Sequence, residues 1–320
     1  MKSLWNDEEA KKIAHDPLQM RVYTSRLIGR EPSLVLHGGG NTSVKAEVTN
    51  VFGETEEVLY IKGSGWDLTT IEAEGFSPVR LDALKKMAQL DELSDTDMVR
   101  AQRVAMTDPE APNPSVEAIL HAIIPFKFVD HTHADAVVAI SNTEGGEERI
   151  YSIYGDSVIV VPYIKAGFIL AKKIFEMTRN IDWSRYEGIV LLNHGIFSFH
   201  DEAQTSYERM INLVSKAEEY LEQRGAFRSV AVESRPAPAA PLLKIAQLRK
   251  EVSSAAGTAM LARLNSSEEA RGFANLPDVE SIVTRGPLTP DHVFRAKHIP
   301  MVISRDIPGV VKNFVDEYRK

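Results

Sequence analysis

Apolar residues at strand-like and helical spacings divide the first two thirds of the chain into short segments of both kinds. Strand-like patterns are predicted at residues 44–48, 57–61, 158–161 and 188–199, the last interrupted by Asn193-His194-Gly195. Helical spacing is found over residues 81–106 and 201–224, and Gly225 is placed to end the second helix. Strands that alternate with helices predict an α/β domain.

The middle of this region contains an abrupt polar motif between apolar runs. Residues 126–140 have the pattern of a strand whose centre is Asp130-His131-Thr132-His133. Just before it, Asn113-Pro114 predicts a helix start, with the helix ending near Pro125. A first helical segment leads to the glycine-rich stretch 36–43.

A Pro/Ala-rich stretch predicts the domain organisation. Residues 228–241 have the composition of a linker, which separates a domain over 1–227 from a C-terminal extension over 242–320. The extension is predicted to be helical over 242–275, strand-like over 281–284 and helical over 310–318, a smaller α/β portion.

Composition narrows the classes of function. The chain has 320 residues, 43% of them hydrophobic and 26% charged, as in ordinary globular proteins. It lacks an apolar run near the ~20 residues of a membrane helix, and its N-terminus lacks signal-peptide features, so we expect a cytoplasmic protein without membrane contact. The net charge of −8 argues against nucleic-acid binding but leaves a small anionic substrate open. Without cysteine, a metal site must use His, Asp and Glu.

His131 and His133 are the first candidate metal ligands. Residues i and i+2 of a strand project from the same face, so both imidazoles reach one ion. His194, at the end of an apolar strand and before a turn-permitting glycine, is the candidate third ligand. A surface His-x-His pair and a simple turn histidine are the alternatives. Burying unpartnered imidazoles costs a few kcal/mol, which a shared ion avoids.

Glu117 is the candidate acid–base residue, beside Ser115 near the predicted helix start. The alternative is that it only complements the helix dipole. His121 lies one helical turn further on, as a packing residue or as a partner of the site.

Two glycine-rich loops, residues 38–43 and 63–65, expose backbone N–H groups and hydroxyls that suit an anion such as phosphate; the alternative is that both are only turns. Neither loop fits the Walker or the dinucleotide pattern, so no NAD site is expected.

Taken in order, these motifs resemble those of the class II aldolase/adducin family over residues 15–225. Within the family the chain is most similar to the aldolase part of bifunctional rhamnulose-1-phosphate aldolase/alcohol dehydrogenases. The motifs that carry the resemblance are Gly40-Asn41-Thr42-Ser43, Lys62-Gly63-Ser64-Gly65, Pro114-Ser115-Val116-Glu117, His131-Thr132-His133, Asn193-His194-Gly195 and Gly286-Pro287-Leu288-Thr289-Pro290-Asp291-His292-Val293. Val116 departs from the family pattern, in which a second hydroxyl often precedes the glutamate.

The resemblance implies a three-layer α/β/α domain with a mixed, largely antiparallel central sheet. It further implies a homotetramer that cleaves a ketose 1-phosphate, such as rhamnulose 1-phosphate, to dihydroxyacetone phosphate and an aldehyde. The implied residues are metal ligands His131, His133 and His194 for Zn²⁺ or Mn²⁺, catalytic Glu117 and Tyr151 (or Tyr154), and phosphate-binding Asn41, Ser43, Ser64, Gly65 and Ser115.

Two alternative functions stay open at this point. The same fold carries sugar-phosphate epimerases, dehydratases and decarboxylases, and it also occurs in adducin-like modules without catalysis. Thr289, Asp291 and His292 are candidates to fold over the site, or simply to begin a helix or turn.

Overall fold

The computed structural model describes residues 1–226, 242–295, 298–303 and 306–319. The chain divides into two compact units, one of Met1–Ala226 with Leu288–Arg295 and one of Phe227–Pro287 with Ala296–Lys320. The predicted linker, 228–241, lies outside the described residues. The domain limits drawn from the sequence stay a prediction.

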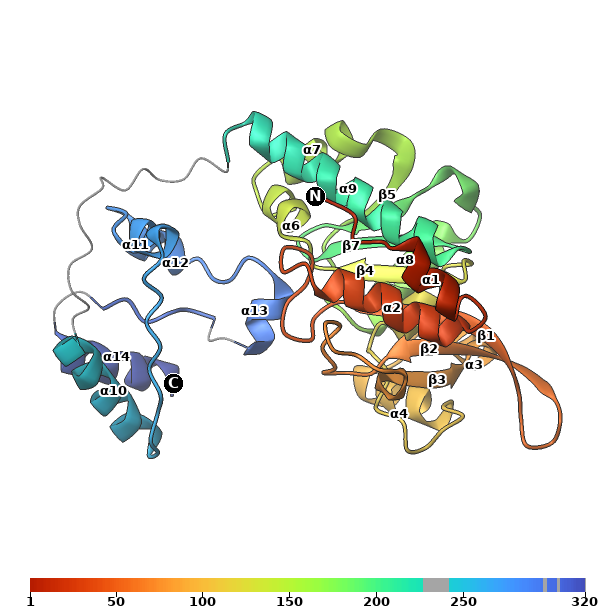
Figure 1. Cartoon of the computed structure of the whole chain (residues 1–320), viewed down its shortest axis with the longest axis horizontal. Helices are drawn as coiled ribbons and strands as arrows, with labels where there is room; N and C mark the ends of the chain where they lie inside the picture. Colours follow the sequence, from red (N-terminus) through yellow and green to blue (C-terminus); the bar gives the residue numbers. More distant parts are fainter. Residues whose placement is uncertain (227–241, 296–297, 304–305, 320) are drawn as a thin grey trace. The chain divides into compact units, whose positions relative to one another are not determined.

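A seven-stranded sheet forms the centre of the first unit, in the order β3-β2-β1-β4-β7-β6-β5 (Figure 1). Its neighbouring strands are antiparallel except for the parallel pair β5–β6, which confirms the mixed, largely antiparallel sheet. The strands are β1 (Asn41–Thr49), β2 (Thr55–Lys62), β3 (Phe76–Arg80), β4 (Phe128–Thr132), β5 (Val158–Val161), β6 (Gly188–Leu191) and β7 (Gly195–His200).

Helices cover both faces of this sheet and complete the three layers (Figure 1). On one face pack α2 (Pro17–Gly29), α6 (Asp135–Ser141), α7 (Gly146–Tyr154) and α9 (Ala203–Gln223). On the other face pack α3 (Leu81–Gln89), α4 (Asp95–Val104), α5 (Ala118–Ile123) and α8 (Phe168–Thr178). The first unit also contains α1 (Asp7–Ile13) and the short 3-10 helices η1 (Ala73–Gly75), η2 (Gly155–Ser157) and η3 (Trp183–Arg185).

The two-residue period of the strands sorts side chains between these layers. On β6, Val190 packs with the α2/α9 layer, whereas Ile189 and Leu191 pack with the α5/α8 layer. On β4, Val129 packs toward α5, so His131 shares that face, while Asp130 and Thr132 face α2 and α9. The alternation thus places an imidazole on one side of β4 and a carboxylate on the other.

Asp130 belongs to a fully buried ion pair on the α2/α9 side. Its Oδ1 lies 2.5 Å from Nη2 of Arg21, and its Oδ2 accepts a hydrogen bond from the Ser206 hydroxyl. Arg21 also donates to the carbonyl oxygens of Ser43 and Val129, so one guanidinium joins β1, β4 and α2. Burial lowers the pKa of Arg21, and the Asp130 carboxylate opposes that shift. The network fixes the strand that carries His131.

The structure corrects the predicted course of residues 113–140. The helix predicted from Pro114 begins only at Ala118, because Ser115 donates its N–H to the Lys62 carbonyl and Pro114 forms an isolated bridge with Gly63. The apolar run that follows His133 is helix α6 and not part of a strand. Short apolar runs do not distinguish a buried strand from a buried helix, which explains the error.

Of two further predictions for the first unit, the structure corrects one and confirms the other. The interruption at Asn193-His194-Gly195 is a tight turn between antiparallel strands β6 and β7, so the predicted single strand is a hairpin. The long amphipathic helix is confirmed as α9, which Gly225 follows in a left-handed conformation with φ of 70°.

The described part of the chain after residue 241 is helical. Its helices are α10 (Leu242–Ala256), α11 (Glu268–Ala274), α12 (Val279–Val283), α13 (Pro290–Arg295) and α14 (Ile307–Tyr318), so the expected α/β character is wrong for these residues. The strand predicted at 281–284 lies mostly in α12, where Val279, Ile282 and Val283 are half-buried at helical spacing. The helix predicted over 242–275 is interrupted after Ala256, at Gly257 with φ of 69°.

No helix within the described ranges has both the length and the apolarity required to cross a membrane.

Candidate metal centre

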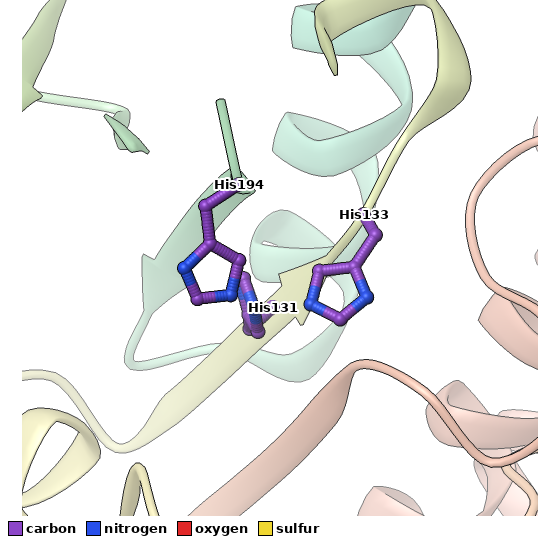
Figure 2. Close-up of side chains that lie close together, drawn as sticks. All are labelled: His131, His133 and His194. Carbon is purple, nitrogen blue, oxygen red and sulfur yellow. The ribbon is translucent and has the colours of Figure 1, made fainter. Parts of the chain in front are cut away.

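Two neighbouring strands bring the three predicted histidines together. His131 lies on β4 and His133 immediately after it, while His194 lies in the β6–β7 turn (Figure 2). Gly195 makes this close approach possible, because a Cβ there would stand 2.3 Å from the Thr132 carbonyl oxygen. The same Cβ would also crowd the rings of His131 and His133. Packing therefore requires glycine at residue 195, and the turn itself places Asn193 in the left-handed region, with φ of 60°.

The three imidazoles converge on one point in the interior (Figure 2). One ligand nitrogen of each lies within 4.8 Å of the other two, and the ring centroids are separated by 4.9, 5.1 and 5.1 Å. The exposed fractions of His131, His133 and His194 are 0%, 6% and 8%. Within the described ranges this is the only group of His, Cys, Asp or Glu residues close enough to hold an ion.

Hydrogen bonds to the outer nitrogens leave the inner ones available. Nδ1 of His131 lies 3.1 Å from the Ile196 carbonyl oxygen, and Nδ1 of His133 lies 2.5 Å from Oδ1 of Asp291. Since both partners accept, each Nδ1 carries the proton and each Nε2 presents a lone pair. This is the arrangement commonly found around metal-ligating histidines.

Burial favours the neutral form of two of these imidazoles, His131 and His194, and the neutral form is the one that binds a metal. Burial lowers the pKa of His131 well below the usual value, with further lowering from the neighbouring His133 and His194. Burial also lowers the pKa of His194, and the Glu117 carboxylate partly opposes that shift.

A divalent cation fits this set of donors. Nε2 of His131 and Oε1 of Glu117 are buried without a hydrogen-bond partner, which is costly unless another group satisfies them. Three imidazoles and a nearby carboxylate suit Zn²⁺, and Mn²⁺ is compatible. The residues present therefore match the ion that the sequence motifs imply.

Glu117 stands directly beside the triad. It occupies the N-cap position of α5, and its two carboxylate oxygens lie 3.4 Å from Nε2 of His131 and 3.5 Å from Nε2 of His194. The side chain is 5% exposed and makes no capping hydrogen bond to its own helix. The alternative explanation, that Glu117 only complements the helix dipole, does not account for this orientation.

A chain of buried hydrogen bonds positions Glu117. The amide nitrogen of Asn41 donates to Oε2 of Glu117 at 2.6 Å, and the amide oxygen of Asn41 lies 2.5 Å from Nε2 of His121. His121 therefore donates from Nε2 and accepts from the Ser43 hydroxyl at Nδ1, 2.8 Å away. Burial lowers the pKa of His121 well below its usual value, which keeps the ring neutral as this chain requires. His121 is thus a partner of the site.

The strand register explains why these groups meet. Asn41 of β1 pairs with His131 of β4, which pairs with Phe197 of β7, so the three side chains form a row on the α5 face. Ser43 lies two residues along β1 on that same face. His131 stacks on Phe197 with ring centroids 4.1 Å apart.

The two glycine-rich loops lie next to the segment that carries Glu117. Nζ of Lys62 donates to the Gly38 carbonyl, and the Ser64 N–H donates to the Asn113 carbonyl. Ser64 and Gly65 are exposed, whereas Ser115 is buried and its hydroxyl accepts the Glu117 N–H. The phosphate-binding role predicted for these residues stays a prediction.

The predicted tyrosines do not join the described cluster. Tyr151 lies on α7 and is 49% exposed, and the hydrogen bonds described for the site do not include it. Tyr154 is buried and donates its hydroxyl to the Leu213 carbonyl.

Asp291 and Thr289 are buried in the first unit, and Asp291 reaches His133. Thr289 bonds instead to Nδ1 of His292.

Comparison with known proteins identifies the family. The model of the class II aldolase and adducin N-terminal domain matches residues 19–221, and that of the aldolase class II second domain matches residues 240–320. The chain belongs to the class II aldolase and adducin family.

Relatives of this class II aldolase family member include a curated Bacillus subtilis protein and solved structures. The chain is 30% identical over 312 residues to the uncharacterized oxidoreductase YuxG, covering 95% of this chain and only 44% of that protein. The N-terminal class II aldolase domain of a conserved Thermoplasma acidophilum protein is 42% identical, with a TM-score of 0.62 over 69% of this chain and 99% of that one. An l-fuculose-1-phosphate aldolase from Thermus thermophilus is 18% identical, with a TM-score of 0.41 over 65% of this chain and 96% of that one.

Proposed function

We propose that the chain is a metal-dependent aldolase that reversibly cleaves a ketose 1-phosphate, such as rhamnulose 1-phosphate, to dihydroxyacetone phosphate and an aldehyde. Family membership supports a class II aldolase in general. One observation carries the proposal: a buried carboxylate with an unpaired oxygen, Glu117, lies within 3.5 Å of the imidazole nitrogens of two of the three converging histidines, His131 and His194.

His131, His133 and His194 would hold Zn²⁺ or Mn²⁺. When bound, the ion supplies Lewis-acid stabilisation of the negative charge that collects on the substrate oxygens as the carbon–carbon bond breaks. The surrounding protein excludes water from the imidazoles, since all three are nearly fully buried.

Glu117 would return a proton to the carbon that loses the aldehyde, and would remove it in the reverse reaction. Asn41 would hold one oxygen of Glu117, so the other oxygen faces the substrate. No Schiff-base lysine is required for this chemistry.

The phosphate would be held where the two glycine-rich loops meet the Glu117 segment. Ser64 and Gly65 lie on an exposed turn whose backbone is joined to residues 113–115. Asn41 and Ser43 point into the hydrogen-bond chain that ends on Glu117, so we assign the direct phosphate contacts to Ser64, Gly65 and Ser115.

Tyr151 is proposed to act from a neighbouring subunit of a homotetramer, because its position on α7 is half-exposed. During cleavage it would accept the proton of the hydroxyl that becomes the aldehyde oxygen, and in the reverse reaction it would protonate that oxygen. We also propose a cytoplasmic location, as expected from the sequence, and a relationship to the aldolase part of bifunctional aldolase/alcohol dehydrogenases, as the motifs imply. The chain spans less than half the length of its curated relative.

The test is release of dihydroxyacetone phosphate from rhamnulose 1-phosphate and fuculose 1-phosphate by protein loaded with Zn²⁺ or Mn²⁺. We expect release from at least one substrate and its loss after chelation. No release from either substrate contradicts the aldolase proposal. Analysis of the same samples identifies two alternatives: a new isomer of unchanged mass, separated by chromatography, indicates an epimerase, and loss of water indicates a dehydratase. A decarboxylase is tested separately, by release of carbon dioxide from a sugar phosphate that carries a carboxylate.

An adducin-like module without catalysis is the alternative from another class. Such a module has no need for three buried imidazoles beside an oriented carboxylate, and this chain keeps all four groups.

A further inference from the structure

Asp291 is the acidic side chain beside the triad that the proposed mechanism does not use. It lies on α13 and is 3% exposed, although it is 158 residues away from His133 in sequence. Segment Leu288–Arg295 belongs to the same compact unit as the metal centre, yet it falls within the range matched by the family's second-domain model. Residues matched to the second domain therefore reach the metal centre of the first.

Both carboxylate oxygens of Asp291 have defined partners. Oδ1 accepts from Nδ1 of His133 at 2.5 Å, and Oδ2 accepts from the Leu36 backbone N–H at 2.7 Å. Two bonds from two directions fix the plane of the carboxylate, and with it the orientation of the His133 ring. An asparagine amide in this place cannot accept both hydrogen bonds, because its nitrogen is a donor and not an acceptor.

The glycine-rich loop is shaped to admit this carboxylate. A Cβ on Gly39 would lie 1.6 Å from Oδ1 of Asp291, so any side chain at residue 39 excludes Asp291 from its position. The loop was predicted from the sequence to bind an anionic ligand. In the structure the Asp291 carboxylate lies against this segment instead. It accepts a hydrogen bond from the Leu36 N–H and occupies the space that a side chain at residue 39 would need.

We propose that Asp291 is a positioning residue of the metal centre, supplied by the second-domain sequence. By accepting the Nδ1 proton of His133, it holds the tautomer in which Nε2 is free to ligate the ion, and it raises the basicity of that nitrogen. The inference deepens the proposed function and rests on its metal centre.

Metal affinity and the His133 tautomer test this proposal in the full chain. Zn²⁺ affinity, measured by competition with a chromophoric chelator, should fall about 10–100-fold in Asp291→Ala and Asp291→Asn. In the metal-free protein, histidine ring ¹⁵N spectra should show His133 protonated at Nδ1 in the wild type and shifted toward Nε2 protonation in Asp291→Ala.

Asp182→Asn is the matched control, because Asp182 also accepts two hydrogen bonds, both from Ser184, but is exposed at the N-cap of η3. It should leave both readouts unchanged. Wild-type affinity and an unchanged tautomer in Asp291→Ala would overturn the proposal. If metal affinity and tautomer respond as expected but no substrate is cleaved, the aldolase assignment fails and the role of Asp291 stands.

Discussion

Replacing Glu117 with glutamine is expected to lower kcat for aldol cleavage by about 10²–10⁴-fold, the range typical of general acid–base residues. Glutamine preserves the shape of the side chain and still accepts the hydrogen bond from Asn41 that now ends on Oε2. It cannot exchange a proton with carbon. The variant should therefore keep its metal, because the three imidazoles are untouched.

The proton-transfer step can be measured separately from cleavage. With dihydroxyacetone phosphate alone in D₂O, the wild type should exchange one carbon-bound hydrogen for deuterium, and Glu117→Gln should not. Glu187→Gln, a change at the half-buried residue just before β6, serves as the control. A Glu117→Gln protein that cleaves and exchanges within about tenfold of the wild type would remove Glu117 from the mechanism.

Replacing Arg21 with methionine should lower the free energy of unfolding by about 3–5 kcal/mol, the usual cost of leaving a buried charge without its partner. Asp130 would keep a single side-chain donor, Ser206, inside a fully buried layer. The backbone carbonyls of Ser43 and Val129 would also lose a donor. Denaturant unfolding of wild type and variant measures the difference.

Measuring Ser206→Ala beside Arg21→Met separates the cost of losing the charged partner of Asp130 from the cost of losing one hydrogen bond to it. That variant removes one hydrogen bond from Asp130 and should cost only about 1 kcal/mol. The double variant Arg21→Met/Asp130→Leu removes both charges, so it should be more stable than Arg21→Met alone. Equal costs for Arg21→Met and Ser206→Ala would show that the ion pair does not hold β4 in place.

The sequence predicts which three histidines come together, because the signal for each of them is local. The spacing of His131 and His133 and the glycine after His194 carry the information within a few residues. The same two-residue alternation that directs His131 toward α5 directs Asp130 toward Arg21, so the buried ion pair was also within reach of a sequence argument.

The remaining features depend on contacts that no local pattern encodes. Asp291 reaches His133 only because α13 packs into the first unit, far along the chain from the triad. The onset of α5 was misplaced because Pro114 and Ser115 bond to the turn at Lys62 and Gly63, a tertiary interaction that overrides a good helix-start sequence. The hydrogen bond between the Ser43 hydroxyl and His121 also depends on strand register, and the phosphate role that the resemblance implies for Ser43 stays a prediction.

Anomalous diffraction from crystals grown with Zn²⁺, combined with metal analysis of the same protein, tests whether the three imidazoles hold one divalent cation. We expect one ion per chain within bonding distance of His131, His133 and His194, and loss of that ion in His131→Ala. A protein that takes up no ion at this position, or that binds one equally well without His131, would contradict this expectation.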